Sequence, residues 1–124
     1  MHLLDSNILI YASKPGGEFL NTRIISKDAR VSAISLPEVL GYPGLNAQDE
    51  AVFDRWFADL RRLDVTEPIL RRAAALRRER RMKLGDAIVA ATALTHDLEL
   101  VTRNVEDFKH VAGLRVINPF ASEV

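Results

Sequence analysis

Four acidic residues that lie far apart in the sequence occupy comparable local settings. Asp5 follows a short apolar run, and Glu38 and Asp86 stand near the starts of apolar segments. Asp107 belongs to an Asn-x-x-Asp motif that comes after another apolar run. If these runs are parallel strands and the segments are helices, the acids meet at the carboxyl edge of one sheet, which is where such sheets bind ligands. Several carboxylates that converge in a crevice need a cation.

Each of these acids also has a local explanation. Glu38 comes three residues after Ser35, which is the spacing of a capping box, and judged alone this explanation is the stronger one. Asp5 and Asp86 are equally suited to capping a helix or to complementing its dipole. Asn104 and Asp107 have the spacing of a local cap pair. Only the convergence of acids from remote parts of the chain favours a shared site over four separate caps.

The donor types predict which ion such a site takes. Carboxylate and amide oxygens favour magnesium, with manganese as an alternative, over zinc. The sequence has no cysteine, and its three histidines lack the spacing of zinc ligands: His2, His96 and His110. The matching chemistry is metal-assisted hydrolysis of a phosphodiester bond. In this hypothesis Asp5 and Asp86 bind the ion directly, and Glu38 and Asp107 complete the site directly or through water.

Other hydrolytic and nucleotide-binding motifs are absent from the sequence. It contains no Gly-x-Ser-x-Gly elbow, no cysteine nucleophile and no glycine-rich phosphate loop. A phosphate-handling enzyme of another doubly wound family, with Asp5 as nucleophile, remains an alternative. Such enzymes generally have a second aspartate two residues later, where this chain has Asn7.

The charge of the chain is balanced, with 17 basic and 17 acidic residues. The basic residues are nevertheless concentrated between positions 71 and 83, where the only acid is Glu79. That stretch contains Arg71, Arg72, Arg77, Arg78, Arg80, Arg81 and Lys83. A solvated helix face is the simplest interpretation, and a stripe that follows nucleic-acid phosphates is the alternative.

Hydrophobic patterning predicts strands and helices that alternate along the chain. We expect strands at 2–5, 30–34, 63–65, 98–102 and 114–117. We expect helices at 6–13, 18–27, 35–40, 48–62 and 86–94, another from Thr66 to the break at Gly85, and a short turn at 104–108. The apolar stripe of Phe53, Trp56 and Phe57 is assigned to the core, with a partner groove as the alternative. Strict alternation favours a parallel sheet covered by helices on both faces.

Length and composition favour one globular domain over residues 1–124. The chain has 124 residues and is 48% hydrophobic, enough for a single core. The N-terminus does not resemble a signal peptide and no apolar run is long enough to span a bilayer, so we expect a soluble protein with no membrane association. The lack of cysteine is compatible with a cytoplasmic location.

Four segments together make the chain resemble a known family. They are Leu-Leu-Asp5-Ser-Asn7, Ser35-Leu-Pro-Glu38-Val, Gly85-Asp86-Ala-Ile-Val-Ala-Ala and Val-Thr102-Arg-Asn-Val-Glu-Asp107-Phe. With these motifs in this order and spacing, the chain resembles PIN-domain ribonucleases, particularly VapC-type toxins of type II toxin-antitoxin systems, over essentially its whole length. The resemblance implies a five-stranded parallel sheet sandwiched between helices and a magnesium-dependent RNA endonuclease.

The resemblance also assigns roles to single residues. Asp5, Glu38 and Asp86 match the three most dependable acids of the family, and Asn7 matches a polar residue that supports the first acid. The fourth position is ambiguous, because some members have an aspartate where this chain has Asn104. Asp107 matches a second acidic position three residues later and is assigned provisionally.

The resemblance further implies partners that composition does not show. These are an RNA substrate, a second copy of the chain in a homodimer, and a cognate antitoxin protein whose tail covers the active site. The principal alternative is a catalytically degenerate member of the same fold that acts as an RNA-binding or protein-interaction module.

Overall fold

The structure, a computed structural model, describes residues 1–120. Within these residues a single parallel sheet contains β1 (His2–Leu4), β2 (Ala29–Ser32), β3 (Arg61–Leu63), β4 (Glu99–Val101) and β5 (Val116–Ile117). The strand order is β3-β2-β1-β4-β5. The order therefore reverses at β1, which lies between β2 and β4. The expected α/β fold with a five-stranded parallel sheet is confirmed.

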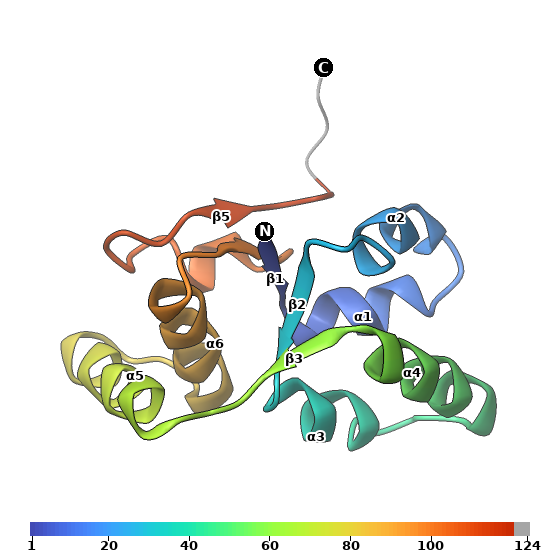
Figure 1. The fold of residues 1–124 in the computed structure, drawn as a ribbon, viewed down its shortest axis with the longest axis horizontal. Helices are drawn as coiled ribbons and strands as arrows, with labels where there is room; N and C mark the ends of the chain where they lie inside the picture. Colours follow the sequence, from blue (N-terminus) through green and yellow to red (C-terminus); the bar gives the residue numbers. More distant parts are fainter. Residues whose placement is uncertain (121–124) are drawn as a thin grey trace.

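Helices cover both faces of the sheet. The helices are α1 (Ser6–Ala12), α2 (Asn21–Ile24), α3 (Ser35–Leu40), α4 (Ala47–Asp59), α5 (Glu67–Glu79) and α6 (Leu84–Thr95). Two 3-10 turns, η1 (Glu18–Leu20) and η2 (Val105–Asp107), complete the described elements. Figure 1 shows α1 to α4 on one side of the sheet and α5 with α6 on the other.

Alternating side chains of the central strands build two cores. Leu3 of β1 and Leu100 of β4 pack in the cluster under α5 and α6. Their neighbours Leu4 and Val101 pack in the cluster under α1 to α4. This period-two alternation buries both faces of β1 and β4, as expected of central parallel strands.

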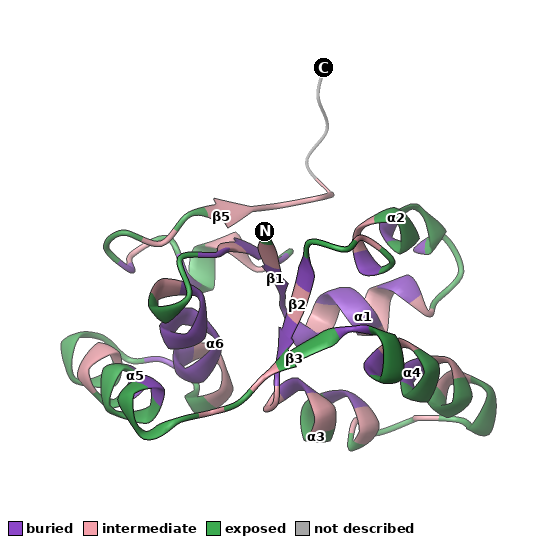
Figure 2. Cartoon of the chain, viewed as in Figure 1, coloured by how far each residue is buried: buried purple, intermediate pink, exposed green. Residues whose placement is uncertain are grey.

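Helix α6 is the most deeply buried helix of the molecule (Figure 2). Its residues from Ala87 to Ala93 are all buried, and four of these seven are alanine. These small side chains let α6 approach the sheet and α5 closely. The buried hydroxyl of Thr92 donates a hydrogen bond to the carbonyl of Ile88 at 2.7 Å. The N-terminal turn of α6 is thereby held at a defined place beside the carboxyl edge of the sheet.

Several expected element boundaries differ from the structure, and at two of them a single buried apolar residue explains the difference. Helix α4 ends at Asp59, not at residue 62, and β3 begins at Arg61. Leu60 between them adopts an extended conformation and is buried, so its burial ends the helix. Helix α5 ends at Glu79, well before Gly85, which lies inside α6. Here Met82 is buried against the core of α5 and α6, which requires an extended loop from residue 80 to 83.

The expected assignment of the aromatic stripe of α4 to the core is confirmed. Phe53 and Phe57 are buried in the cluster under α1 to α4, and Trp56 packs partly buried against it. No helix within residues 1–120 combines the length and apolarity needed to cross a membrane.

Two consecutive residues of α5 provide a test of this packing. Ile69 is fully buried and Leu70 is 46% exposed. Ile69→Ala should lower the free energy of unfolding by about 2 to 5 kcal/mol because it leaves a cavity in the core. Leu70→Ala should change it by about 0.5 kcal/mol or less. Urea denaturation of both variants measures the contrast, and equal losses would contradict the packing of α5 described here.

Candidate active site

Asp5 lies at the point where the strand order reverses. It follows β1 directly, and its backbone N–H donates to the carbonyl of Val101 at the end of β4, at 2.9 Å. Its side chain is only 4% exposed. The hydroxyl of Thr102, the residue after β4, donates to Asp5 Oδ2 at 2.8 Å. The ends of two adjacent strands therefore hold this carboxylate in one orientation.

Burial and charge act together on Asp5. Desolvation is the largest effect and raises the pKa of Asp5 from 3.8 to about 6. The hydrogen bond from Thr102 lowers the pKa, whereas the nearby carboxylates of Asp86 and Glu38 raise it further. A backbone hydrogen bond from Ser6 gives a smaller lowering. The carboxylate thus lies in a strongly acidic environment that disfavours its own negative charge.

The capping-box explanation of Glu38 is wrong. Ser35 lies inside α3, and the residue in the N-cap position, Ile34, has a helical conformation and no capping side chain. The hydroxyl of Ser6 instead donates to Glu38 Oε1 at 2.6 Å, from the first residue of α1. Glu38 is thus oriented by a different helix, α1, which begins directly after Asp5.

Glu38 also contacts the first turn of α6. A Cβ atom placed on Gly85 would lie 2.2 Å from Glu38 Oε2, far closer than real Cβ contacts allow. The absence of a side chain at position 85 therefore makes room for this carboxylate. Through this contact Glu38 lies next to the turn that carries Asp86.

Asp86 is partly buried in the first turn of α6, and its pKa is raised. Desolvation is the main cause, and the charges of Asp107 and Glu38 raise the pKa further. Lys83 acts in the opposite direction. Asp86 is therefore the acid that links the others electrostatically.

Two neighbouring cavities meet at Asp86. The first has a volume of about 410 Å³, and its lining includes Asp5, Asn7, Glu38 and Asp86. The second has a volume of about 460 Å³, and its lining includes Asp86 and Asp107. Lys83 also lines both. The structure therefore brings Asp5, Glu38 and Asp86 to one cavity and places Asp107 in the adjoining one.

The residues of ambiguous role occupy different places. Asp107 is exposed and lies in η2, within electrostatic reach of Asp86. Asn104 lines neither of the two cavities, and its backbone N–H donates to the hydroxyl of Thr102 at 3.0 Å. Asn7 lines the first cavity, but the side-chain hydrogen bond to Asp5 comes from Thr102 in the described part of the chain.

The chemistry of the donor set fits a divalent cation with oxygen ligands. Asp5 and Asp86 are two partly or fully buried carboxylates with raised pKa values, and a bound cation would offset their repulsion. Within residues 1–120, however, no group of three or more His, Asp or Glu side chains is already arranged to hold a metal ion. The fold therefore brings the carboxylates near one another without arranging three of them as metal ligands in the described residues.

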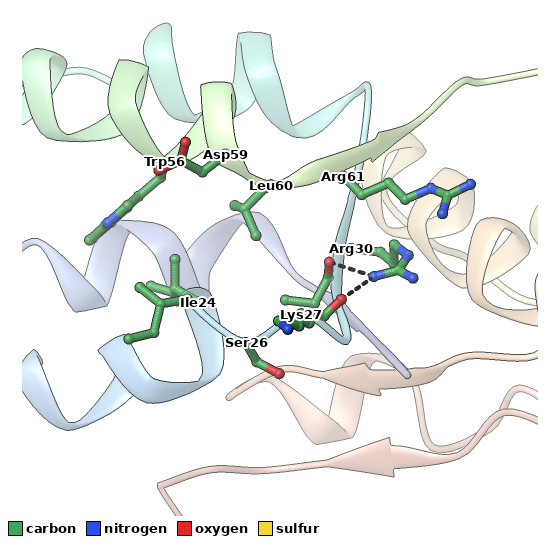
Figure 3. Close-up of a pocket in the computed structure, with 10 residues that line it drawn as sticks. Ile24, Ser26, Lys27, Arg30, Trp56, Asp59, Leu60 and Arg61 are labelled. Carbon is green, nitrogen blue, oxygen red and sulfur yellow. Dashed lines mark hydrogen bonds between the residues drawn. The ribbon is translucent and has the colours of Figure 1, made fainter.

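A separate cavity of about 440 Å³ lies near the amino ends of β2 and β3 (Figure 3), and none of the four candidate acids lines it. Ile24, Trp56 and Leu60 line it together with the basic residues Lys27, Arg30 and Arg61. Asp59 is the only acid among the lining residues, so this cavity has no carboxylate cluster.

Sequence reasoning missed four residues that shape the acidic cavity. Thr102 and Ser6 orient carboxylates, Gly85 makes room for one, and Lys83 offsets the charge of another. Ser6, Gly85 and Thr102 stand inside the quoted motifs and Lys83 stands in the basic stretch, and these positions were the only available signal. Their roles depend on neighbours that are remote in sequence.

The raised pKa of Asp5 predicts a pH-dependent stability. The folded state holds the Asp5 proton up to about pH 6, whereas the unfolded chain releases it near its ordinary pKa of 3.8. Without metal, stability therefore falls as the pH rises through this interval, by up to about 3 kcal/mol. Asp5→Asn should remove this loss.

Urea denaturation in EDTA between about pH 4 and pH 7 checks this expectation. Asp54 is exposed on α4, so Asp54→Asn is the matched control and should keep the dependence of the wild type. Parallel stability curves for wild type and Asp5→Asn would show that Asp5 has an ordinary pKa in the folded protein.

Comparison with known proteins gives the chain a family. The PIN domain family matches residues 2–114. Ribonuclease VapC10 of Mycobacterium tuberculosis is 35% identical over 130 residues, covering 98% of this chain and 94% of that protein. A toxin-antitoxin complex from Klebsiella pneumoniae contains a chain with 30% identity and a TM-score of 0.78, covering 98% of this chain and 100% of the other.

The structure of FitAcB from Neisseria gonorrhoeae shows the same fold, with 26% identity and a TM-score of 0.79. It covers 98% of this chain and 100% of the matching chain. The family match includes all four acids, the strands that precede them and the helix that carries Asp86. By sequence and by fold, the chain belongs to the PIN domain family and is a relative of the VapC-type ribonucleases.

Proposed function

We propose that this protein is a magnesium-dependent RNA endonuclease, with manganese as an alternative ion, and the toxin of a toxin-antitoxin pair. One observation carries the proposal: Asp5, Glu38 and Asp86 line one cavity at the carboxyl edge of the sheet. Burial is the main reason that the pKa of Asp5 is raised, and the charges of Asp86 and Glu38 raise it further, so a positive ion in this cavity would be favourable. The similarity to Ribonuclease VapC10 supports RNA as the substrate.

The reaction is hydrolysis of a phosphodiester: a water oxygen adds to phosphorus, and the bond from phosphorus to one ester oxygen breaks. When bound, the divalent ion supplies an activated water and neutralises charge on the phosphate. Asp5 and Asp86 are assigned to hold it, and Glu38 and Asp107 complete the site directly or through water. Thr102 keeps Asp5 in the orientation needed for this role.

The similarity to solved complexes supports a partner protein. The Klebsiella pneumoniae relative was solved as a toxin-antitoxin complex. We infer that this chain has a cognate antitoxin that covers the acidic cavity, and that it forms a homodimer in the cytoplasm.

RNA cleavage by the purified protein tests the proposed function. The wild type should cut total RNA in magnesium and should stop cutting in EDTA. Loss of an outer-shell partner of a metal typically costs about 10 to 100-fold, so Asp5→Asn, which changes a direct ligand, should lose at least about 100-fold in rate. Asp54→Asn should cut RNA at the rate of the wild type. If the wild type binds RNA without cutting it in magnesium or manganese, the chain is a catalytically degenerate RNA-binding module.

The RNA path follows from the positions of the basic residues. Arg80 and Arg81 line the cavity that adjoins Asp86 and Asp107, in the loop between α5 and α6. Neither forms an ion pair with an acid of residues 1–120. By contrast, Arg71 pairs with Glu67 on the exposed face of α5. The basic stretch is therefore divided, and we infer that its loop part contacts the phosphates of RNA beside the acids.

A pair of charge-matched double variants tests this path. Arg80→Gln with Arg81→Gln should weaken binding of a labelled single-stranded RNA in EDTA by about tenfold or more. It should also make the slope of log affinity against log salt shallower by about 1.4, the value expected for two lost phosphate contacts. Arg71→Gln with Arg72→Gln removes the same charge from α5 and should have a much smaller effect. Fluorescence anisotropy measures the RNA affinity and its salt dependence. Equal effects of the two double variants would mean that RNA binding depends on net charge and not on the position of Arg80 and Arg81.

A further inference from the structure

We propose that Ser6 and Gly85 are positioning residues that together set the carboxylate of Glu38. Glu38 is exposed and has a long flexible side chain, so its position in a site must be imposed by its neighbours. The first turns of α1 and α6 supply one neighbour each, from regions about eighty residues apart in the sequence. The consequence for metal binding rests on the proposed function, whereas the contacts themselves do not.

Ser6 supplies the directional contact. Its side chain is buried, and its Oγ lies 2.6 Å from Glu38 Oε1 and 2.8 Å from the Oγ of Ser35. A hydroxyl has one proton and a carboxylate only accepts, so Ser6 donates to Glu38 and accepts from Ser35. Ser35 is fully buried and in turn fixes the rotamer of Ser6. The hydroxyl groups of Ser35 and Ser6 therefore form a chain of two hydrogen bonds that orients Glu38.

Gly85 supplies the space. A Cβ atom at this position would lie 2.2 Å from Oε2, 3.1 Å from Cδ and 3.6 Å from Oε1 of Glu38. All three carboxyl atoms thus lie over the α-carbon of Gly85. The clashing group is the free end of a flexible side chain, so a methyl group at position 85 displaces the Glu38 carboxylate and leaves the backbone in place.

The position set in this way has an electrostatic consequence. The N-terminal turn of α6 carries partial positive charge, which favours a carboxylate beside it. The same turn carries Asp86, and the carboxylates of Glu38 and Asp86 line one cavity. Ser6 and Gly85 therefore hold Glu38 close to Asp86 against the repulsion between the two acids. Two carboxylates held close together in this way would favour the binding of a cation to both Glu38 and Asp86.

Thermal melting with magnesium and with EDTA tests the role of Gly85. Gly85→Ala should lose more than half of the magnesium-dependent rise in melting temperature seen for the wild type. In EDTA it should melt at the same or a higher temperature, because alanine is a better helix former than glycine. A merely structural role predicts the opposite pattern, with the loss appearing in EDTA. A variant that keeps the full magnesium shift would overturn the proposal.

The dependence on Glu38 is tested in a second background. If Gly85 and Ser6 act through Glu38, then Gly85→Ala and Ser6→Ala should each leave the magnesium shift of Glu38→Gln unchanged. Ser13→Ala, at the other end of α1, is the control for removal of a serine hydroxyl and should keep the wild-type shift. If the substitutions at Ser6 and Gly85 reduced the magnesium shift equally in the wild type and in Glu38→Gln, these residues would not act through Glu38, contrary to the proposal.

A measurement without metal separates this inference from the proposed function. In EDTA, chemical denaturation of Ser6→Ala, Glu38→Ala and the double variant gives the coupling between the two side chains. The double variant should be more stable than the sum of the single losses predicts. If the wild type shows no magnesium shift but this coupling is present, the metal assignment fails and the positioning contact stands. Strictly additive losses would remove the contact whether or not the protein binds magnesium.

Discussion

Holding a buried carboxylate beside two other carboxylates at the carboxyl edge of β1 and β4 is the constraint on which the rest of this structure depends. Asp5 is buried with a pKa raised to about 6, and the charges of Glu38 and Asp86 contribute to that shift. A folded chain tolerates such an arrangement only if other contacts hold the acids in place. Thr102 and Ser6 provide such contacts to Asp5 and Glu38, and the alanine-rich core behind α6 holds the helix that carries Asp86.

The rest of the fold can be understood as support for that edge. The strand order reverses at β1, so a crevice opens where β1 and β4 end, and the two helical layers flank it on either side (Figure 1). The α1 to α4 layer carries Glu38, and the α5 to α6 layer carries Asp86. Neither layer alone contains the acidic cavity. The relation of the two layers to the central strands is therefore what assembles the acids.

Much of this arrangement could be predicted from periodicity and from the four motifs. The parallel sheet, the two helical layers and the placement of Asp5, Glu38 and Asp86 near one edge required only strand ends and helix starts. The strand order, the ends of α4 and α5 and the role of Gly85 could not be predicted. Helix α4 ends before Leu60 and helix α5 ends before Met82 because residues remote in sequence bury these two side chains. The role of Gly85 depends on the Glu38 carboxylate, which reaches it from α3. Local patterns do not contain such distances, which is also why a capping box was a reasonable but wrong explanation of Glu38.

The loop from residue 80 to 83 is anchored by the burial of Met82, and Arg77 Nε donates to the Met82 carbonyl at 3.2 Å. Arg80 and Arg81, on the N-terminal side of this anchor, belong to an ordered backbone, so the loop itself would lose little conformational entropy on binding a polyanion. Affinity at this surface and packing of the α5 and α6 core are then thermodynamically linked. If RNA binds there as proposed, a change that loosens the core would free the loop and weaken RNA binding, and bound RNA would stabilise the core in return.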